Sequence, residues 1–267
     1  MRAALRTASA ILWRDAKLAV SYRLNALLTV ASLAFGVTLW FFLAKALEPR
    51  TGDWATGGYF AYVVTGTALM GYVQAALQTT GRRLRQEQMT GTLEMLLAAP
   101  APPYLLVAAS ALWDLLAKTL EVAVVLALAA AFGLRFAVAS WWALLAVMAL
   151  TLVNFLALGI LASGVLLVFQ RGEPVTPFVG GLFTLLGGVF FPPEMLPSWL
   201  EGLSRLIPLP YALDAFRAVL QRGAGLRGVG GDLAVLAGFA AVLLPLSWIS
   251  LAAGLGLAKR HGLLGRY

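Results

Sequence analysis

The sequence predicts an all-α membrane protein with six transmembrane helices, from its composition, its long apolar stretches and the distribution of its basic residues. The 267 residues are 61% hydrophobic and 12% charged, and the mean hydropathy is +0.85. Soluble domains are about half apolar and about one quarter charged, so this chain could not cover its surface with polar groups in water. No polar linker separates two cores, and residues 1–267 are therefore interpreted as a single membrane domain.

Six stretches are long and apolar enough to span a bilayer. A helix that crosses ~30 Å of hydrocarbon needs about 20 apolar residues. Small residues spaced four apart predict close helix contacts in three of these stretches, at Gly180–Thr184–Gly188, Ser250–Gly254–Ala258 and Gly159–Ser163. The predicted spans lie near residues 24–47, 57–78, 104–132, 141–169, 175–191 and 232–257.

Lysine and arginine residues set the expected orientation, because cytoplasmic loops carry an excess of them. With the N-terminus inside, the inner segments hold twelve and the outer segments seven. Both termini are therefore expected in the cytoplasm. The formal charge of +8 and the pI of about 10.2 would suggest nucleic acid as the partner of a soluble protein. Here the basic residues flank the spans, so anionic lipid headgroups and no nucleic acid are expected.

Residues 1–22 contain a basic amphipathic stretch. Over 2–20, apolar and basic side chains fall on two different arcs of a helix, and Trp13 lies among the basic ones. This pattern predicts an interface helix that lies in the headgroup plane. The alternative is a solvated N-terminal extension.

The inner loop 81–103, GRRLRQEQMTGTLEMLLAAPAPP, is the only predicted cytoplasmic segment between spans that is long enough for a helix of its own. About three turns fit between Glu87 and Leu97, and Pro100 ends them. Leu93 and Leu96 belong to a short apolar stripe on this helix. The helix either packs beneath the bundle or inserts into a groove on a cytoplasmic partner.

The outer segment 192–231 is too interrupted to span and too apolar for a free loop. Its prolines divide it into two short helices, near 197–206 and 210–221. Non-helical backbone at membrane depth survives only where protein or water covers it. The segment is therefore expected to dip back into the outer leaflet against the bundle, with a cap resting on the surface as the alternative.

Three charges interrupt the third predicted span. Asp114, Lys118 and Glu121 fall on one face of a helix, and pairing within the helix would lower the cost of burying them. They either face a polar pathway or partner helix, or they lie near the inner headgroups if the helix begins deep in the cytoplasm.

Catalytic and cofactor signatures are missing from the sequence. There is no cysteine, the single histidine, His261, lies in the basic C-terminal tail, and no GxxxxGK[ST] phosphate loop occurs. We therefore expect neither a catalytic site nor a cofactor bound by this chain.

Two stretches resemble the ABC-2 type transporter permeases, the membrane subunits of ATP-binding-cassette exporters. Residues 87–100, EQMTGTLEMLLAAP, are similar to the family's E-x-x-x-GTLE-x-LL-x-x-P segment. Residues 187–220 resemble its pattern of G-x-FFP, then LP-x-W, then P-x-x-YA-x-D-x-x-R. In this chain the second pattern includes Phe191, Pro192, Pro197, Trp199, Pro208, Tyr211, Asp214 and Arg217.

The resemblance implies a six-span subunit of the inner membrane that forms a dimer with a second permease copy and recruits two ABC ATPase subunits. ATP and Mg would be bound by those partners. It implies that 87–97 is the coupling helix and that 192–221 forms re-entrant helices above the translocation path. The candidate contacts with the ATPase are Glu87, Gly91, Thr92, Leu93 and Glu94.

The sparse charge in the spans favours a hydrophobic or amphipathic cargo over a small ion, whose hydration shell polar groups would have to replace. Two other classes of function stay open. One is a secondary transporter that needs no ATP, although halves 1–133 and 134–267 show no clear repeat. The other is a membrane enzyme that acts on lipid, for which Asp114, Lys118 and Glu121 form the nearest cluster of titratable groups.

Overall fold

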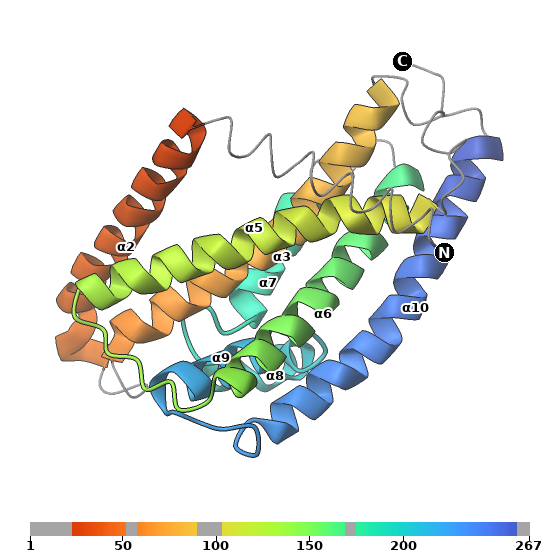
Figure 1. Ribbon diagram of the computed structural model, residues 1–267. Coiled ribbons are helices and arrows are strands. Elements are labelled where there is room, and N and C mark those ends of the chain that lie inside the picture. The colour runs from red at the N-terminus through yellow and green to blue at the C-terminus, as the bar shows by residue number, and fades with distance from the viewer. Residues whose placement is uncertain (1–22, 52–57, 90–102, 169–174, 261–267) are drawn as a thin grey trace.

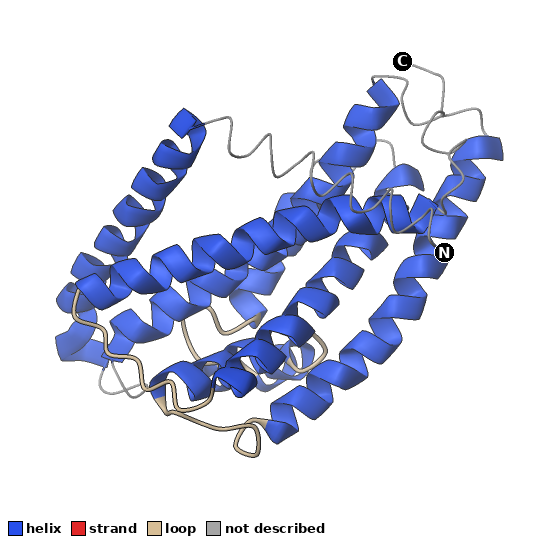
Figure 2. Ribbon diagram, in the orientation of Figure 1, coloured by secondary structure: helices blue, strands red, loops and turns tan. Residues whose placement is uncertain are grey.

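The computed structural model describes residues 23–51, 58–89, 103–168 and 175–260, and these ranges form an all-α bundle without strands (Figure 2). The all-helical class is therefore confirmed for the described residues. The predicted interface helix, 2–20, lies outside them. The elements in order are α2 (Arg23–Thr51), α3 (Gly58–Met89), α5 (Pro103–Ala131), α6 (Trp141–Val168), α7 (Val175–Leu186), a 3₁₀ turn (Pro193–Met195), α8 (Ser198–Ser204), α9 (Leu209–Gln221) and α10 (Gly230–Arg260).

Four helices in the described ranges have the length and composition of membrane spans: Ala26–Leu47, Gly58–Leu77, Trp141–Val165 and Gly230–Gly254. They correspond to the first, second, fourth and sixth predicted spans. Helix α5 has 29 residues, as the third predicted span requires, but it carries the three charged residues noted above. Helix α7 has only 12 described residues, which cover about 18 Å at 1.5 Å per residue. The six-span arrangement therefore stays a prediction.

The fifth predicted span, 175–191, is wrong at its C-terminal end. Helix α7 ends at Leu186, and the chain turns over 187–191 before Pro192. Gly188 follows with a φ of +73°, the left-handed conformation with which many helices end. Apolar residues continue to Phe191, so hydropathy alone carried the predicted span too far.

Helix α3 lies at the centre of the bundle. In its membrane-span segment, 78% of the residues are buried, and the helix packs against α2, α5, α6, α7 and α9. Leu69 and Tyr72 are fully buried. The Tyr72 hydroxyl donates a hydrogen bond of 2.6 Å to Thr119 Oγ1, which joins α3 to α5. Figure 1 shows α5 lying along α3 over much of its length.

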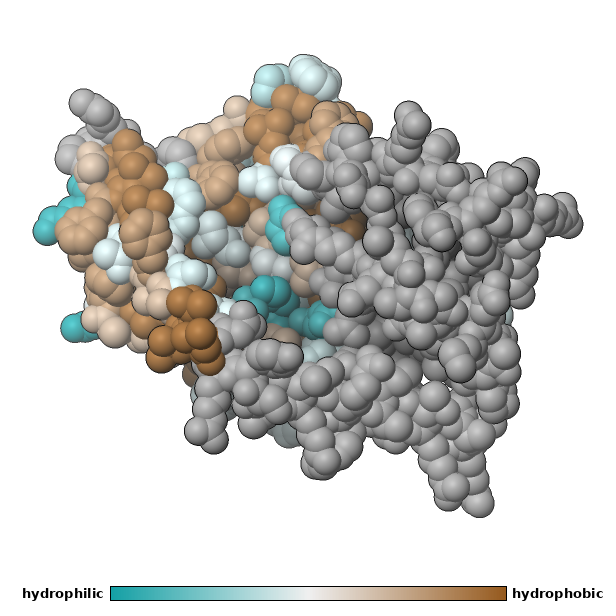
Figure 3. Space-filling view, turned by 90° about the horizontal axis from the view of Figure 1, so that it is seen from above, coloured by the Kyte–Doolittle hydropathy of each residue, from teal (hydrophilic) through white to brown (hydrophobic). Residues whose placement is uncertain are grey.

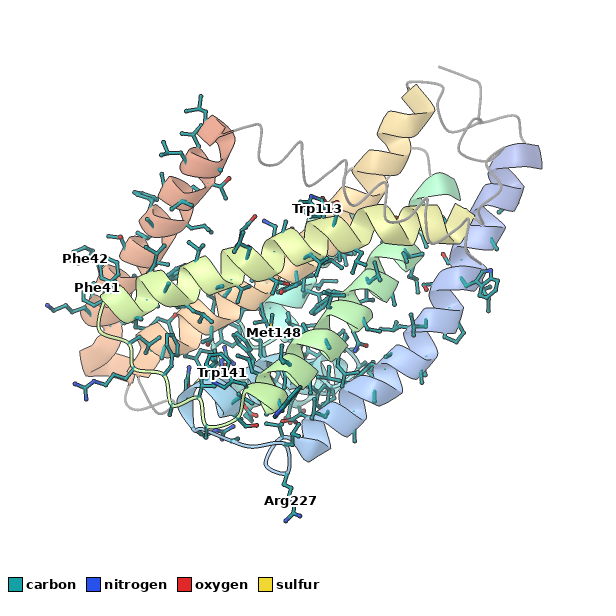
Figure 4. All side chains as sticks on the ribbon, viewed as in Figure 1. Phe41, Phe42, Trp113, Trp141, Met148 and Arg227 are labelled. Atoms are coloured by element: carbon teal, nitrogen blue, oxygen red, sulfur yellow. The ribbon has the colours of Figure 1, made fainter. Side chains whose placement is uncertain are left out.

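Helix α2 stands at the edge of the bundle (Figure 1). Only 6% of its span is buried, and Phe35 is 73% exposed. Its attachment is aromatic, because the Phe41 ring lies 5.4 Å from that of Phe60 and 4.9 Å from that of Phe132. Phe41 and Phe42 are labelled at this attached end in Figure 4. Figure 3, viewed from above, shows apolar side chains (brown) over much of the coloured surface, with polar ones (teal) in its middle and at its outer edge.

Helices α6 and α10 approach each other closely at small residues. A Cβ atom on Gly164 would lie 2.4 Å from the Ser250 carbonyl carbon, and one on Gly254 would lie 2.5 Å from the Gly164 oxygen. Ser250 Oγ donates to the Leu161 carbonyl at 3.0 Å. The close contacts expected at Ser250 and Gly254 are confirmed, because small residues let two backbones approach in lipid.

Candidate functional site

The 192–231 segment folds into the two short helices that its prolines predict. Pro197 precedes α8 and Pro208 precedes α9, where a missing backbone N–H costs nothing. Helix α9 is an integral part of the bundle, because ten of its thirteen residues are buried and it packs against α3, α6 and α10. The segment therefore includes a helix held firmly against the predicted spans.

Arg217 of α9 is the centre of the site. Arg217 is only 6% exposed. Nη2 donates to the carbonyl oxygens of Tyr62 at 3.0 Å and Gly188 at 2.9 Å, and Nε donates to Thr65 Oγ1 at 3.3 Å. The guanidinium carbon lies 3.5 Å from the centroid of the Tyr62 ring, which adds a cation–π contact. One side chain thus joins α9, α3 and the turn that follows α7.

The carbonyl groups that Arg217 binds are available for local reasons. Gly188 lies just beyond the end of α7, where a helix has no partner of its own for its last carbonyls. A cation there also faces the negative end of the helix dipole. In α3, Thr65 Oγ1 donates to the Ala61 carbonyl at 2.7 Å, and the oxygen keeps acceptor capacity for Arg217.

A backbone contact strengthens the same junction. A Cβ on Gly66 would lie 2.3 Å from the Val189 oxygen, so only glycine permits this approach of α3 to the turn. Gln221, one turn beyond Arg217, donates from Nε2 to the Ala61 carbonyl at 3.2 Å. We call residues 61–66 of α3, the turn 187–191 and Arg217 with Gln221 the α3–α9 joint.

Asp214 precedes Arg217 by three residues and is exposed at the edge of α9. Part of the residue is open to solvent, but neighbouring protein atoms desolvate its carboxyl group and raise its pKa to about 6; the nearby Arg217 opposes this change, and Asp232 and Glu194 reinforce it. Burial lowers the pKa of Arg217, while Tyr62 and Asp214 raise it. The Arg217 guanidinium remains charged, as arginine does in proteins.

The other predicted residues of this segment are more peripheral. Tyr211 donates from its hydroxyl to the Arg205 carbonyl at 3.2 Å, which links the end of α8 to α9. Trp199 is 67% exposed. Phe191 and Pro192 are half-buried and Pro197 is exposed. The structure thus brings Arg217 into the joint and leaves Trp199 at the surface.

The three charged residues of α5 form the second candidate site. Lys118 Nζ lies 2.6 Å from Glu121 Oε2, and these side chains are 32% and 28% exposed. Asp114 lies one turn away and is half-buried. A Cβ on Gly71 would lie 3.9 Å from Lys118 Cδ, so Lys118 lies beside Gly71, away from either end of the α3 span. The depth of these charges in the membrane, in a polar pathway or near the inner headgroups, stays a prediction.

One of the predicted ATPase contacts, Glu87, lies within the described residues. Glu87 belongs to α3, which continues to Met89, so the predicted inner loop 81–103 starts later than expected and residues 87–89 extend α3 rather than begin a separate helix. Gly91, Thr92, Leu93 and Glu94 lie outside the described residues. Sequence reasoning did not find Tyr62 and Thr65 as partners of Arg217. Their only signal is a Thr-Gly pair within an apolar helix, and a backbone carbonyl leaves no trace in the sequence.

Comparison with known proteins agrees with this architecture. The profile of the family described as ABC-2 type transporter matches residues 7–220. The inner membrane transport permease YadH of Escherichia coli (strain K12) is 29% identical over 182 residues, which cover 68% of this chain and 71% of YadH. The YadH protein of Shigella flexneri is similar to the same extent.

Proposed function

The chain belongs to the family of ABC-2 type transporters, and from this membership we propose that it is the permease subunit of an exporter that moves a hydrophobic or amphipathic molecule. The family and the apolar helices make it a multi-pass protein of the inner membrane and a component of a membrane transporter. The export direction and the class of cargo are our proposal. Drugs, lipids and glycans are the classes we consider, because the bundle is largely apolar.

We propose that two cytoplasmic ABC ATPase subunits bind this permease and supply the free energy by hydrolysing ATP with Mg bound on their own chains. A second copy of the permease would complete the transporter, with six spans per copy, both termini in the cytoplasm and residues 192–221 dipping into the outer leaflet. Closure of the ATPase dimer would push on the coupling helix at 87–97. The helical bundle would transmit this push as a rigid-body tilt that changes which side the path faces.

One observation carries this proposal. The family match, residues 7–220, contains both stretches that resemble the permeases, 87–100 and 187–220. The first supplies the expected contact with an ATPase, and the second supplies α9 and its joint with α3. A small ion would need a row of polar groups to replace its hydration shell. The few charges in the spans therefore favour an amphipathic cargo.

Co-purification tests the proposal directly. The chain would be extracted in mild detergent together with its native neighbours, and the bound proteins would be identified. We expect a stoichiometric ATPase subunit, lost on Gly91→Pro because proline breaks the helix that docks. Gly225→Pro is the matched control, since Gly225 lies in a loop and a Cβ there meets no atom within 4 Å. An ATPase retained in Gly91→Pro would contradict the docking assignment. Ion-driven transport by the purified chain alone would replace the proposal with a secondary transporter.

A further inference from the structure

The α3–α9 joint lies at one end of a single long helix whose other end reaches the predicted ATPase contact. Helix α3 runs without interruption from Gly58 to Met89, and its 32 residues extend over about 48 Å. The helix contains no proline, the residue that most often interrupts a helix. Tyr62 and Thr65 lie near its first residue and Glu87 near its last. The joint and the end that carries Glu87 therefore belong to one continuous helix.

Every attachment in the joint is short-ranged. Hydrogen bonds between N–H and oxygen are typically about 2.7 to 3.2 Å long and are lost by about 3.6 Å, so a slide of about 1 Å between α9 and α3 would break the bonds of Arg217. The guanidinium of Arg217 is buried, and water cannot replace its lost partners. The residue is also held by two different elements, the carbonyl of Tyr62 in α3 and that of Gly188 after α7. The three elements can separate only if the Arg217 guanidinium becomes exposed to water or stays buried without its hydrogen-bond acceptors.

The joint extends to α8 through a further buried bond. Ser204 Oγ, at the end of α8, donates to the carbonyl of Leu186, the last residue of α7, at 2.6 Å. Leu186 directly precedes the turn that Arg217 holds. Helix α8, the turn and α9 are therefore connected to α3 by side-chain hydrogen bonds that meet at Arg217.

We propose that Arg217 is a positioning residue of the transport cycle, which makes α8, the turn 187–191 and α9 move together with α3. Movement imposed on α3 at Glu87 would then displace the 192–231 segment as one body. Arginine suits this role because its planar group donates in several fixed directions and stacks on Tyr62 at the same time. Lysine carries the same charge and has neither property. This inference rests on the proposed function, since it needs an ATPase that acts on the end of α3.

Two cysteine reporters in the full permease–ATPase complex test the inference. The chain has no cysteine, so each introduced thiol carries the only label on the permease. One reporter is Gln78→Cys on α3. The other is Gly202→Cys on α8, where a Cβ meets no atom within 4 Å. An environment-sensitive fluorophore on each would be recorded in lipid nanodiscs, with and without ATP, Mg and vanadate.

With Arg217 in place, we expect both reporters to respond to the nucleotide. In Arg217→Lys, the Gln78→Cys reporter should still respond, while the response at Gly202→Cys should fall, because losing one charge-assisted hydrogen bond weakens the equilibrium constant that couples α9 to α3 by about tenfold. Thr65→Val is the second variant. It removes one acceptor of Arg217 with little change in volume, so it tests the same joint if Arg217→Lys does not fold. Gln221→Leu provides a comparison that keeps every Arg217 bond, and we expect a smaller loss from it.

The outcomes separate the two proposals. Equal responses at Gly202→Cys in the unmodified, Arg217→Lys and Thr65→Val proteins would overturn the inference while leaving the proposed function intact. Loss of both responses in Arg217→Lys and in Thr65→Val, with the ATPase still bound, would also overturn it, because the joint would then support the fold as a whole. No response at either position in the unmodified complex would count against the proposed function itself.

Discussion

Gly66 offers a direct test of how closely α3 approaches the turn 187–191. The change is Gly66→Ala, which adds one methyl group facing the backbone of Val189. That Cβ would lie 2.3 Å from the Val189 oxygen and 3.0 Å from its Cα. Backbone atoms cannot rotate away as a flexible side chain does. The turn or the helix would therefore have to shift by about 1 Å to restore ordinary contact.

The expected cost follows from two opposing terms. Overpacking by one methyl group costs about 1 to 3 kcal/mol, and the upper end applies because the obstacle is backbone. Alanine gains back about 1 kcal/mol over glycine in a helix interior. We therefore expect Gly66→Ala to lower the free energy of unfolding by about 2 kcal/mol.

Gly71→Ala is the matched control in the same helix. A Cβ there meets only Lys118 Cδ, at 3.9 Å, which is an ordinary contact. This variant should be neutral or about 1 kcal/mol more stable. The two variants differ by about 2 to 3 kcal/mol, so at about 2 to 4 °C per kcal/mol they should melt roughly 4 to 12 °C apart in detergent, as followed by tryptophan fluorescence. Equal melting temperatures would refute the close approach of α3 to the turn.

Three further predictions concern polar groups in the bundle. Asn154→Leu removes the 3.0 Å hydrogen bond from Asn154 Nδ2 to the Leu236 carbonyl. The free energy of unfolding should change by less than about 1 kcal/mol, because such bonds between membrane helices are weak. A larger loss in a denaturant titration would contradict this prediction. Lys118→Met should cost about 3 kcal/mol by stranding the Glu121 carboxylate, and adding Glu121→Leu should recover most of that loss, as a double-mutant cycle would measure. The raised pKa of Asp214, about 6 against an ordinary 3.8, means that the folded state binds this proton more tightly than the unfolded state. The stabilising contribution of Asp214 is complete below about pH 4 and is lost as the pH rises through about 6, so the melting temperature should fall over this range. Asp214→Asn should flatten that part of the plot of melting temperature against pH. An unchanged plot would refute the raised pKa.

Local and compositional features were predictable from the sequence because they arise within short stretches of chain. Apolar stretches of about 20 residues indicated the four helices that qualify as spans. Pro197 and Pro208 predicted where α8 and α9 begin, because proline suits the start of a helix and not its interior. The small residues Ser250 and Gly254 indicated a close helix contact, and the structure places α6 there.

Pairing across long separations was not predictable in the same way. The sequence placed Arg217 in a segment with family resemblance but gave no partner for it. Its acceptors are backbone carbonyls at Tyr62 and Gly188, which every residue type carries alike. The end of α7 at Leu186 was missed because the apolar run continues through Phe191, and a left-handed glycine is invisible to hydropathy.

The sequence alone therefore determined that this protein is an all-helical membrane protein, that its proline-rich segment forms two short helices, and which family it resembles. These properties depend on hydrophobic composition, proline placement and short motifs, all of which are local. The tertiary structure decided that α9 is buried and that Arg217 joins it to α3 across 155 positions of the chain. It also decided that Lys118 lies beside Gly71 of α3. Such contacts depend on which faces of distant helices meet, and only packing in three dimensions selects them.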